Sequence, residues 1–402
     1  MHCTRHISDD ILWVGGSDKR LNLFENLFPI PKGIAYNSYL ILDEKTALMD
    51  TVDASISRQF IDNILYGLQG RKLDYLIINH MEPDHCANIV ELLHYFPDLK
   101  LVGNAKTFQF LKQFYHVPMT ENMITVKEKE TLCLGKHTLR FFFAPMVHWP
   151  EVMMCFEETE GILFSADAFG SFGSLDGNLF NDEIEFEKEW LDDYRRYYTN
   201  IVGKYGVQVQ MTLKKFAGLD LKMIAPLHGP VWRNNLDQIL GKYDLWSRYT
   251  PEEKSLMIIY GSMYGNTENA VNVLANALSE AGIRNIKIYD ASSTHYSTLI
   301  SESFRCSHIV LAAPTYNGEI YDPIHHYLKE CKSLNLWNRT YGLIDNGTWA
   351  AVAGRQMTDM ISQLKNSTVL EPVVSIQSAL NDQSFAKLME LKEALVESLN
   401  QE

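Results

Sequence analysis

The stretch Leu73-Asp74-Tyr75-Leu76-Ile77-Ile78-Asn79-His80-Met81-Glu82-Pro83-Asp84-His85 holds the densest group of potential metal ligands in the chain. Its first six residues form a mostly apolar run typical of a β-strand, and its polar residues follow directly. Because Pro83 disfavours a helix before Ala87, we expect a curled loop that turns four polar side chains toward one centre. These side chains are His80, Glu82, Asp84 and His85.

Three further candidate ligands stand in the same context, each shortly after an apolar run that predicts a strand. Such positions bring side chains to one edge of a sheet, where α/β folds usually keep their sites. A single His or Asp after a strand is usually an ordinary loop, core or capping residue. The coincidence of four such segments makes that interpretation poor. The three residues are His148 after 139–144, Asp167 after 161–165, and His228 after 223–225.

The seven candidate ligands comprise four imidazoles and three carboxylates, without sulfur. That set is too large for one tetrahedral zinc ion and suits two metal ions that share a carboxylate. Asp167 is the best bridge because a carboxylate has two oxygens and Asp167 follows a strand of its own. Three carboxylates and a bridging hydroxide balance two divalent ions, and the hard oxygen ligands favour iron or manganese over copper.

The rhythm of the sequence changes near residue 255. Short β-type runs with a few helices give way to regular alternation of strands and helices, which is typical of a doubly wound parallel sheet. The polar stretch 246–254 contains Pro251 and is the predicted boundary between two domains, 1–250 and 254–402. The predicted strands are 33–42, 46–50, 75–79, 139–144, 161–165 and 223–225 in the first domain, and 256–260, 286–289, 308–312, 340–344 and 369–375 in the second; helices are expected over 268–281 and through residue 399.

A second candidate site comes from three loops that follow strands of the second domain. In the first loop, backbone N–H groups at a helix start and the hydroxyls of Ser262 and Thr267 form a possible anion cradle. The loop lacks the lysine of a triphosphate loop and the glycines of a dinucleotide loop, so a phosphate monoester fits best. Taken alone, it is equally an ordinary helix cap. The candidate contacts are Ser262, Met263, Tyr264, Gly265, Asn266 and Thr267; Pro314, Thr315, Tyr316, Asn317 and Gly318; and Asn346, Gly347, Thr348 and Trp349.

Two aromatic residues in the later loops favour a ligand site. Tyr316 and Trp349 could stack on a large flat ring system, although both could instead be partly buried loop residues.

Composition limits the remaining possibilities. The chain of 402 residues is 46% hydrophobic and carries a formal net charge of −14, which argues against binding to nucleic acid or to an anionic membrane. No apolar run approaches the roughly 18 to 20 residues that span a bilayer, and the first residues lack the apolar core of a signal peptide. The six cysteines are scattered without a C-x-x-C pair, so we expect a reducing, cytoplasmic location.

Together the two sites resemble one known family. The H-x-E-x-D-H loop with a distant His, Asp and His resembles the metallo-β-lactamase pattern, in which Glu82 replaces a histidine. The loop 262–267 matches the flavodoxin motif [ST]-x-x-G-x-T at Ser262, Gly265 and Thr267. We refer to this loop and the loops 314–318 and 346–349 as the flavin-type loops. Over its whole length the chain is similar to the flavodiiron proteins, reductases of dioxygen and nitric oxide. The resemblance implies a metallo-β-lactamase-like αββα sandwich over 1–250 and a flavodoxin-like, FMN-binding doubly wound sheet over 254–402.

The resemblance also implies roles for the candidate residues, which would form the catalytic diiron centre. A bridging oxo or hydroxo species would complete it, and FMN would pass electrons to the irons. Rubredoxin is the first choice of external donor, with reduced deazaflavin as another, and a head-to-tail homodimer or a dimer of dimers is expected. One iron would be held by His80, Glu82 and His148, the other by Asp84, His85 and His228, with Asp167 as the bridge.

Two further side chains stand near these motifs. Trp149 is a candidate wall of an apolar gas pocket. Tyr197 could donate a hydrogen bond behind the metal ligands, or could be a core tyrosine.

Two other classes of protein remain open. One is a binuclear zinc hydrolase fused to a flavodoxin module, against which Glu82 and the complete set of flavin-type loops argue. The other is an electron-transfer flavoprotein with a structural metal domain, which is hard to reconcile with seven converging ligands. The sequence does not choose between dioxygen and nitric oxide as substrate.

Overall fold

The computed structural model describes residues 2–115 and 122–401 and divides into two units, Met1–Tyr243 and Asp244–Glu402. The division falls within helix α7 (Leu236–Ser247), a few residues before the predicted boundary. No helix in these described ranges combines the length and the apolar character that crossing a bilayer requires.

The first unit is built on two sheets that share one core. The first sheet has the strand order β1-β2-β7-β8-β9-β10-β11, and the second has the order β12-β13-β14-β15-β16. Side chains of both sheets, among them Ile41, Ile77, Phe141 and Phe164, lie in one buried cluster, so the sheets pack face to face. The strands are β1 Arg5–His6, β2 Ile11–Trp13, β7 Tyr39–Leu42, β8 Thr46–Met49, β9 Tyr75–Ile77, β10 Lys100–Gly103, β11 Met123–Thr125, β12 Thr131–Cys133, β13 Thr138–Phe143, β14 Met153–Glu157, β15 Ile162–Phe164 and β16 Met223–Ala225.

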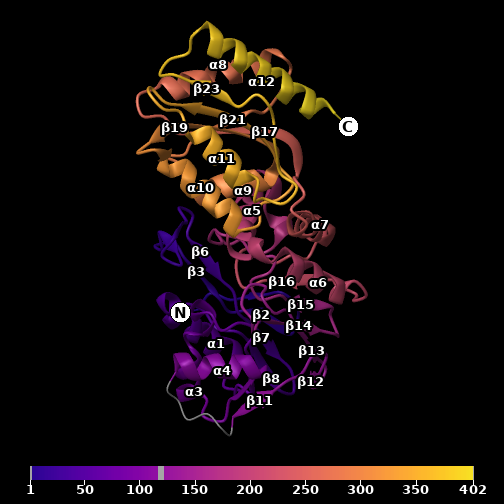
Figure 1. The fold of residues 1–402 in the computed structure, drawn as a ribbon. Helices are drawn as coiled ribbons and strands as arrows, with labels where there is room; N and C mark the ends of the chain where they lie inside the picture. Colours follow the sequence, from indigo (N-terminus) through magenta and orange to yellow (C-terminus); the bar gives the residue numbers. More distant parts are fainter. Residues whose placement is uncertain (1, 116–121, 402) are drawn as a thin grey trace. The chain divides into compact units, whose positions relative to one another are not determined.

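Helices and two small two-stranded sheets complete this unit. In Figure 1, α1 and α4 lie beside the first sheet, and α1 buries Phe60, Ile64 and Leu68 at helical spacing. The helices are α1 Ser57–Leu68, α2 Pro83–Cys86, α3 Ile89–Tyr95, α4 Ala105–Phe114, α5 Leu191–Tyr197 and α6 Gly206–Phe216; the two-stranded pairs are β3 Gly16–Asp18 with β6 Ile34–Tyr36, and β4 Leu23–Phe24 with β5 Phe28–Pro29.

The single strand predicted over 33–42 is wrong, because the structure divides it into β6 and β7. Between them, the buried Asn37 donates its side-chain amide to the carbonyls of Pro226 and Gly229, and its backbone N–H to that of Leu227. These bonds replace ladder pairing at the point where the chain passes from one sheet to another. They also attach this crossing to the loop that carries His228.

The loop after β9 also differs from expectation. We expected no helix before Ala87, whereas Pro83–Cys86 form one helical turn, α2. Pro83 stands at the start of this turn, where a backbone N–H has no helical partner and the fixed φ of proline suits the helix. The turn orients Asp84 and His85 and keeps both buried.

The second unit contains a parallel sheet in the order β18-β17-β19-β21, extended by β22 and β23, which both pair with β21. This is the order of a flavodoxin-like doubly wound sheet, with the switch point between β17 and β19. The predicted strand 369–375 is two strands, since Pro372 between them cannot donate to a ladder. The strands are β17 Glu253–Tyr260, β18 Lys287–Asp290, β19 Cys306–Tyr316, β20 Glu319–Ile320, β21 Thr340–Asn346, β22 Thr368–Val369 and β23 Val374–Ile376.

Helices cover both faces of this sheet. Figure 1 shows α8 and α12 on one face and α9, α10 and α11 on the other. The bounds are α8 Asn266–Glu280, α9 Tyr296–Arg305, α10 Asp322–Ser333, α11 Ala353–Ile361 and α12 Asp382–Asn400. The carboxyl ends of the strands therefore remain open for a ligand.

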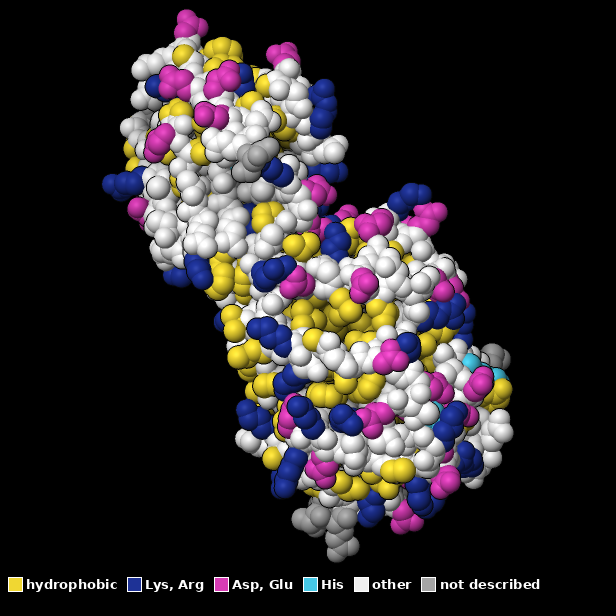
Figure 2. Space-filling model, turned by 90° about the vertical axis from the view of Figure 1, so that its right-hand side faces the viewer, with side chains coloured by type: hydrophobic (Ala, Val, Ile, Leu, Met, Phe, Trp, Pro, Cys, Tyr) yellow, Lys and Arg dark blue, Asp and Glu magenta, His cyan; other side chains and the backbone are white. Residues whose placement is uncertain are grey.

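Charges of both signs are mixed on the face of the molecule that Figure 2 shows. On the face in Figure 2, Lys and Arg side chains are interspersed with Asp and Glu, and apolar side chains gather in a hollow in the lower part of the view. This face thus carries no continuous basic surface of the kind that nucleic acids require.

The buried His308 on β19 makes the stability of the second unit depend on pH. Burial, together with the positive charge of Lys254, lowers the pKa of His308 from 6.5 to about 4. Between these values the unfolded chain binds more protons than the folded chain, so stability present above pH 6.5 is lost as the pH falls toward 4. We expect the free energy of unfolding of the second unit to fall by about 2 kcal/mol over this pH range. Urea denaturation, followed at the transition of this unit, measures the change. H308Q should remove this part of the slope; an unchanged slope would contradict the assignment.

Candidate functional site

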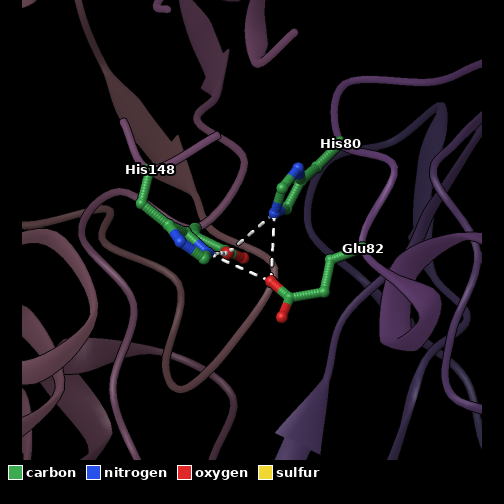
Figure 3. A group of neighbouring side chains, drawn as sticks. His80, Glu82 and His148 are labelled. Carbon is green, nitrogen blue, oxygen red and sulfur yellow. Dashed lines mark hydrogen bonds and ion pairs between the residues drawn. The ribbon is translucent and has the colours of Figure 1, made fainter. Parts of the chain in front are cut away.

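Three of the predicted ligands meet at the ends of β9 and β13. His80, Glu82 and His148 point toward one another in Figure 3. The Oε2 atom of Glu82 lies 3.2 Å from Nε2 of His80 and 3.0 Å from Nε2 of His148. All three side chains are buried. With Asp167 they form a group whose ligand atoms lie within 4.8 Å of one another.

Asp84 and His85 of the same loop form an adjacent group with His228. Nε2 of His85 and Nε2 of His228 each lie 3.4 Å from Oδ2 of Asp84, and these three residues form a second buried group within 4.8 Å. His228 follows β16, the strand that pairs in parallel with β15. The structure thus brings together all seven residues that the sequence indicated.

Asp167 lies between the two groups. Its Oδ2 atom is 3.1 Å from Nε2 of His148 and 3.4 Å from Nε2 of His80. Its Oδ1 atom is 3.0 Å from Nε2 of His85 and 3.6 Å from Nε2 of His228. One carboxylate therefore presents one oxygen to each group, which is the geometry that a bridging ligand needs.

The donor atoms fit metal ions on a further observation. Five atoms of the cluster are buried, and none of them makes a contact with hydrogen-bond geometry among the described residues; the 3.0 Å approach of Asp167 Oδ1 to His85 Nε2 is an ion-pair contact without that geometry. These atoms are both carboxylate oxygens of Asp84, Oδ1 of Asp167, and Nε2 of His85 and of His228. Such atoms are costly to bury unless a ligand satisfies them. All five atoms belong to candidate ligands, so the cluster is suited to cations.

The electrostatics of the cluster point in the same direction. Burial lowers the pKa of His148, but hydrogen bonds to Asp167 and Glu82 outweigh it and raise that pKa to about 9. Burial likewise opposes charge on His85, while Asp84 and Asp167 raise its pKa to about 9. The site attracts positive charge strongly enough to hold protons where metal ions would bind.

Two acidic residues beside the cluster were not indicated by the sequence. The buried Asp50 accepts hydrogen bonds from the backbone N–H groups of Asn79 and His80 and from the Asn79 amide, which holds the start of the ligand loop. Glu25, between β4 and β5, lies beside Glu82, with its own side chain exposed to solvent. Neither follows a pattern that sequence reasoning could have used.

Aromatic rings lie beside the cluster of seven candidate ligands. The Trp149 ring centroid lies 5.3 Å from that of His80, and Phe24 packs edge-on at 5.5 Å from His228. Tyr197 is buried with its ring 5.5 Å from His228, and its hydroxyl has no hydrogen-bond partner within the described part of the chain. Of the two roles considered for Tyr197, the structure shows the buried core tyrosine, and no hydrogen bond from its hydroxyl to a candidate ligand is observed among the described residues.

A third acidic group differs from this cluster. Asp10, His137 and Glu160 also lie close enough to share an ion. Lys136, however, forms an ion pair with Asp10 and lies 3.6 Å from Glu160. The lysine ammonium already supplies the positive charge, so this group does not resemble a metal site.

The three flavin-type loops surround one cavity of about 620 Å³ in the second unit. Fourteen of the fifteen predicted contacts line it; Gly265 does not, but with a φ of 88° it precedes α8 and allows the chain to enter that helix. Ala350, Val352 and Ser378 also line the cavity. No lining residue is charged, and Trp349 and Tyr316 are exposed at 94% and 50%. An open cavity with aromatic walls at a helix N-terminus suits a flat ring that carries a phosphate.

Comparison with known proteins identifies the relatives of this chain. Residues 34–229 match the family model described as ODP family beta lactamase. The anaerobic nitric oxide reductase flavorubredoxin of Klebsiella pneumoniae is 32% identical over 352 residues, which cover 86% of this chain and 72% of the relative. The corresponding protein of Aliivibrio salmonicida is also 32% identical, with 86% and 70% covered.

Solved structures agree. The rubredoxin oxygen:oxidoreductase of Desulfovibrio gigas matches with a TM-score of 0.92 and 26% identity over 99% of this chain and 98% of that one. The flavodiiron protein of Giardia intestinalis has the same fold, with a TM-score of 0.91 and 22% identity over 99% and 96%. The predicted combination of a metallo-β-lactamase-like and a flavodoxin-like fold is confirmed. By these relationships and folds, the chain belongs to the flavodiiron proteins, a family of oxidoreductases.

Proposed function

We propose that this chain reduces dioxygen to water, nitric oxide to nitrous oxide, or both, at a non-haem diiron centre that receives electrons through FMN. The observation that carries the proposal is the position of Asp167, whose two oxygens face two separate groups of buried ligands. The names of the relatives support both gases, and nothing in the cluster favours one of them.

The two irons would be held by distinct sets of residues. His80, Glu82 and His148 would bind the first and Asp84, His85 and His228 the second, with Asp167 and an oxo or hydroxo species as bridges. Two ferrous ions would supply two electrons and open coordination positions for a diatomic gas.

The side chains around the candidate ligands suit a small uncharged substrate. Trp149 and Phe24 place apolar rings beside the ligands His80 and His228 and limit the access of water. The Tyr197 hydroxyl, buried without a hydrogen-bond partner in the described chain, is available to donate to an oxygen atom of the substrate.

FMN would occupy the cavity of the second unit, within the proposed FMN-binding domain 254–402. Its phosphate would lie against the N-terminus of α8, and its ring system against Tyr316 or Trp349. Ser262 shapes the phosphate loop, since its Oγ accepts the N–H of Gly265 at 3.1 Å, while Thr267 Oγ1 accepts from Asn346 at 3.3 Å.

Removing both hydroxyls of the phosphate loop should release the flavin. The double variant S262A/T267V is expected to weaken FMN binding about a hundredfold or more, because each hydrogen bond to a charged group contributes roughly 1.5–3 kcal/mol. Fluorescence titration of the apoprotein with FMN measures the change. The matched control S362A/T368V alters the same residue types outside the cavity and should bind FMN normally. Equal binding by both double variants would contradict the assignment.

Three further features of the system are proposals that follow the family resemblance. The proposed electron donor is rubredoxin or another redox carrier, in keeping with the names of the relatives. The active assembly is a head-to-tail homodimer or a dimer of dimers. A cytoplasmic location is supported by the six cysteines, all within the described residues and all free of disulfide bonds.

Metal analysis combined with parallel gas assays tests the proposed function. Protein produced with iron should contain about two irons and one FMN per chain, and after reduction it should consume dioxygen or nitric oxide; the faster reaction identifies the preferred gas. Two zinc ions with hydrolytic activity would instead support a hydrolase. Bound flavin without gas consumption would support an electron-transfer protein.

A further inference from the structure

Glu151 connects the two loops that hold the first group of ligands. It lies three residues after His148 and is fully buried. Its Oε1 atom accepts a hydrogen bond from Nδ1 of His80 at 2.7 Å and from the backbone N–H of Met81 at 2.9 Å. One carboxylate on the loop after β13 thereby holds both the ring of His80 and the backbone that leads to Glu82.

This contact determines which nitrogen of His80 is available for a metal. Because the N–H at Nδ1 donates a hydrogen bond to Glu151, the lone pair is on Nε2, which faces Glu82 and Asp167 at 3.2 Å and 3.4 Å. A carboxylate behind a histidine ligand fixes the tautomer and the ring orientation and increases the basicity of the coordinating nitrogen.

The second group of ligands has a different support. Nδ1 of His228 lies 2.8 Å from the backbone carbonyl of Ala35, a neutral acceptor. Nδ1 of His85 has no hydrogen-bond partner among the described residues. In the first group, a carboxylate with a full negative charge therefore lies at Nδ1 of His80. Within the described part of the chain, neither His85 nor His228 has a carboxylate at its Nδ1 atom.

Holding the loop in place does not explain that charge. Oε2 of Glu151 is buried without a hydrogen-bond partner in the described chain, and a buried unpaired carboxylate oxygen is costly. A glutamine could accept the same two hydrogen bonds through one neutral oxygen. The geometry thus separates the positioning role of Glu151 from the effect of its charge.

We propose that Glu151 is a positioning residue that fixes His80 as an Nε2 ligand, and that its charge lowers the reduction potential of the metal held by His80, Glu82 and His148. The inference rests on the proposed diiron function and deepens it, because it makes the two irons inequivalent. A nearby negative charge stabilises the more positive, oxidised metal, so removing the charge should raise the potential.

Two substitutions test the two roles. E151Q keeps an oxygen acceptor and should retain about two irons per chain, while the diiron midpoint potential, followed by the mixed-valence EPR signal during a redox titration, moves to more positive values. E151A removes the acceptor and should weaken ferrous ion binding at one of the two positions about tenfold to hundredfold, with FMN content unchanged.

Glu157 offers a matched control in the same unit. It is also fully buried, lies 3.0 Å from Nδ1 of the buried His137, and accepts the N–H groups of Thr159 and Glu160, but contacts none of the candidate ligands. E157Q should leave the diiron potential unchanged. If E151A does not fold, the comparison of E151Q with E157Q still decides.

The outcomes separate this inference from the proposed function. The proposed effect of the Glu151 charge would be overturned, with the proposed function left standing, by either of two results in a protein that shows the wild-type diiron EPR signal. One is an unchanged diiron midpoint potential in E151Q; the other is an equal shift of that potential in E157Q. Unchanged ferrous binding in folded E151A would overturn its positioning role. A wild-type protein without a coupled diiron signal would refute the proposed function and this inference together.

Discussion

Replacing Asp167 with Ala should lower the iron content from about two per chain to one or fewer and reduce gas consumption roughly a thousandfold or more, with the FMN spectrum retained. The reason is geometric, since Asp167 presents one oxygen to each group of ligands. Its removal takes a ligand from both metal positions and a negative charge from between them. Elemental analysis and oxygen- or nitric oxide-electrode assays measure the two effects.

A second aspartate provides the control for this substitution. Asp74 accepts a hydrogen bond from the N–H of Thr46 and forms an ion pair with Lys72. Neither contact involves a candidate ligand. D74A should keep about two irons and normal gas consumption. Retention of both irons and of activity in D167A would show that Asp167 does not bridge the metals, whatever the behaviour of D74A.

The convergence of the seven candidate ligands could be predicted because the ends of strands can be recognised in a sequence. Each follows an apolar run, and the carboxyl ends of neighbouring strands meet at one edge, as those of β15 and β16 do before Asp167 and His228. The flavin-type loops could be predicted on the same grounds. The switch point between β17 and β19 then fixes where they meet.

The residues behind the ligands could not be predicted in this way. Glu151 meets His80 across 71 positions of the sequence, and Asp50 meets Asn79 across 29. Such contacts depend on how two loops approach in space, which no local pattern records. The strand break at Asn37 has the same origin, because its partners Pro226 and Gly229 lie on a distant loop.

The Pro83 prediction failed for a different reason. A proline after the first turn would interrupt a helix, but at its first position proline is favourable. The sequence alone did not show where the turn begins. The structure starts α2 at Pro83 itself, so the residue that we expected to prevent a helix begins one.

Mixing two inactive variants is expected to restore activity if electrons pass between the chains of a dimer. H80A/H148A should lack working irons, and S262A/T267V should lack FMN, so each alone is expected to be inactive. After subunit exchange, half of the dimers are mixed, and one of their two sites combines intact irons of one chain with intact flavin of the other. Activity should therefore return to about a quarter of the wild-type value.

This recovery has a specific physical meaning. The candidate iron ligands lie in the unit Met1–Tyr243 and the candidate flavin cavity in Asp244–Glu402, joined after α7 by a short connection to β17. A head-to-tail twofold interface uses one pair of surfaces twice and would set each flavin against the partner's irons. The control mixes H80A/H148A with D167A, which share the same defect and cannot complement. If mixed dimers of the first pair form, as shown by native mass spectrometry, and activity stays at zero, electrons pass within a chain and the head-to-tail assembly is not the working unit.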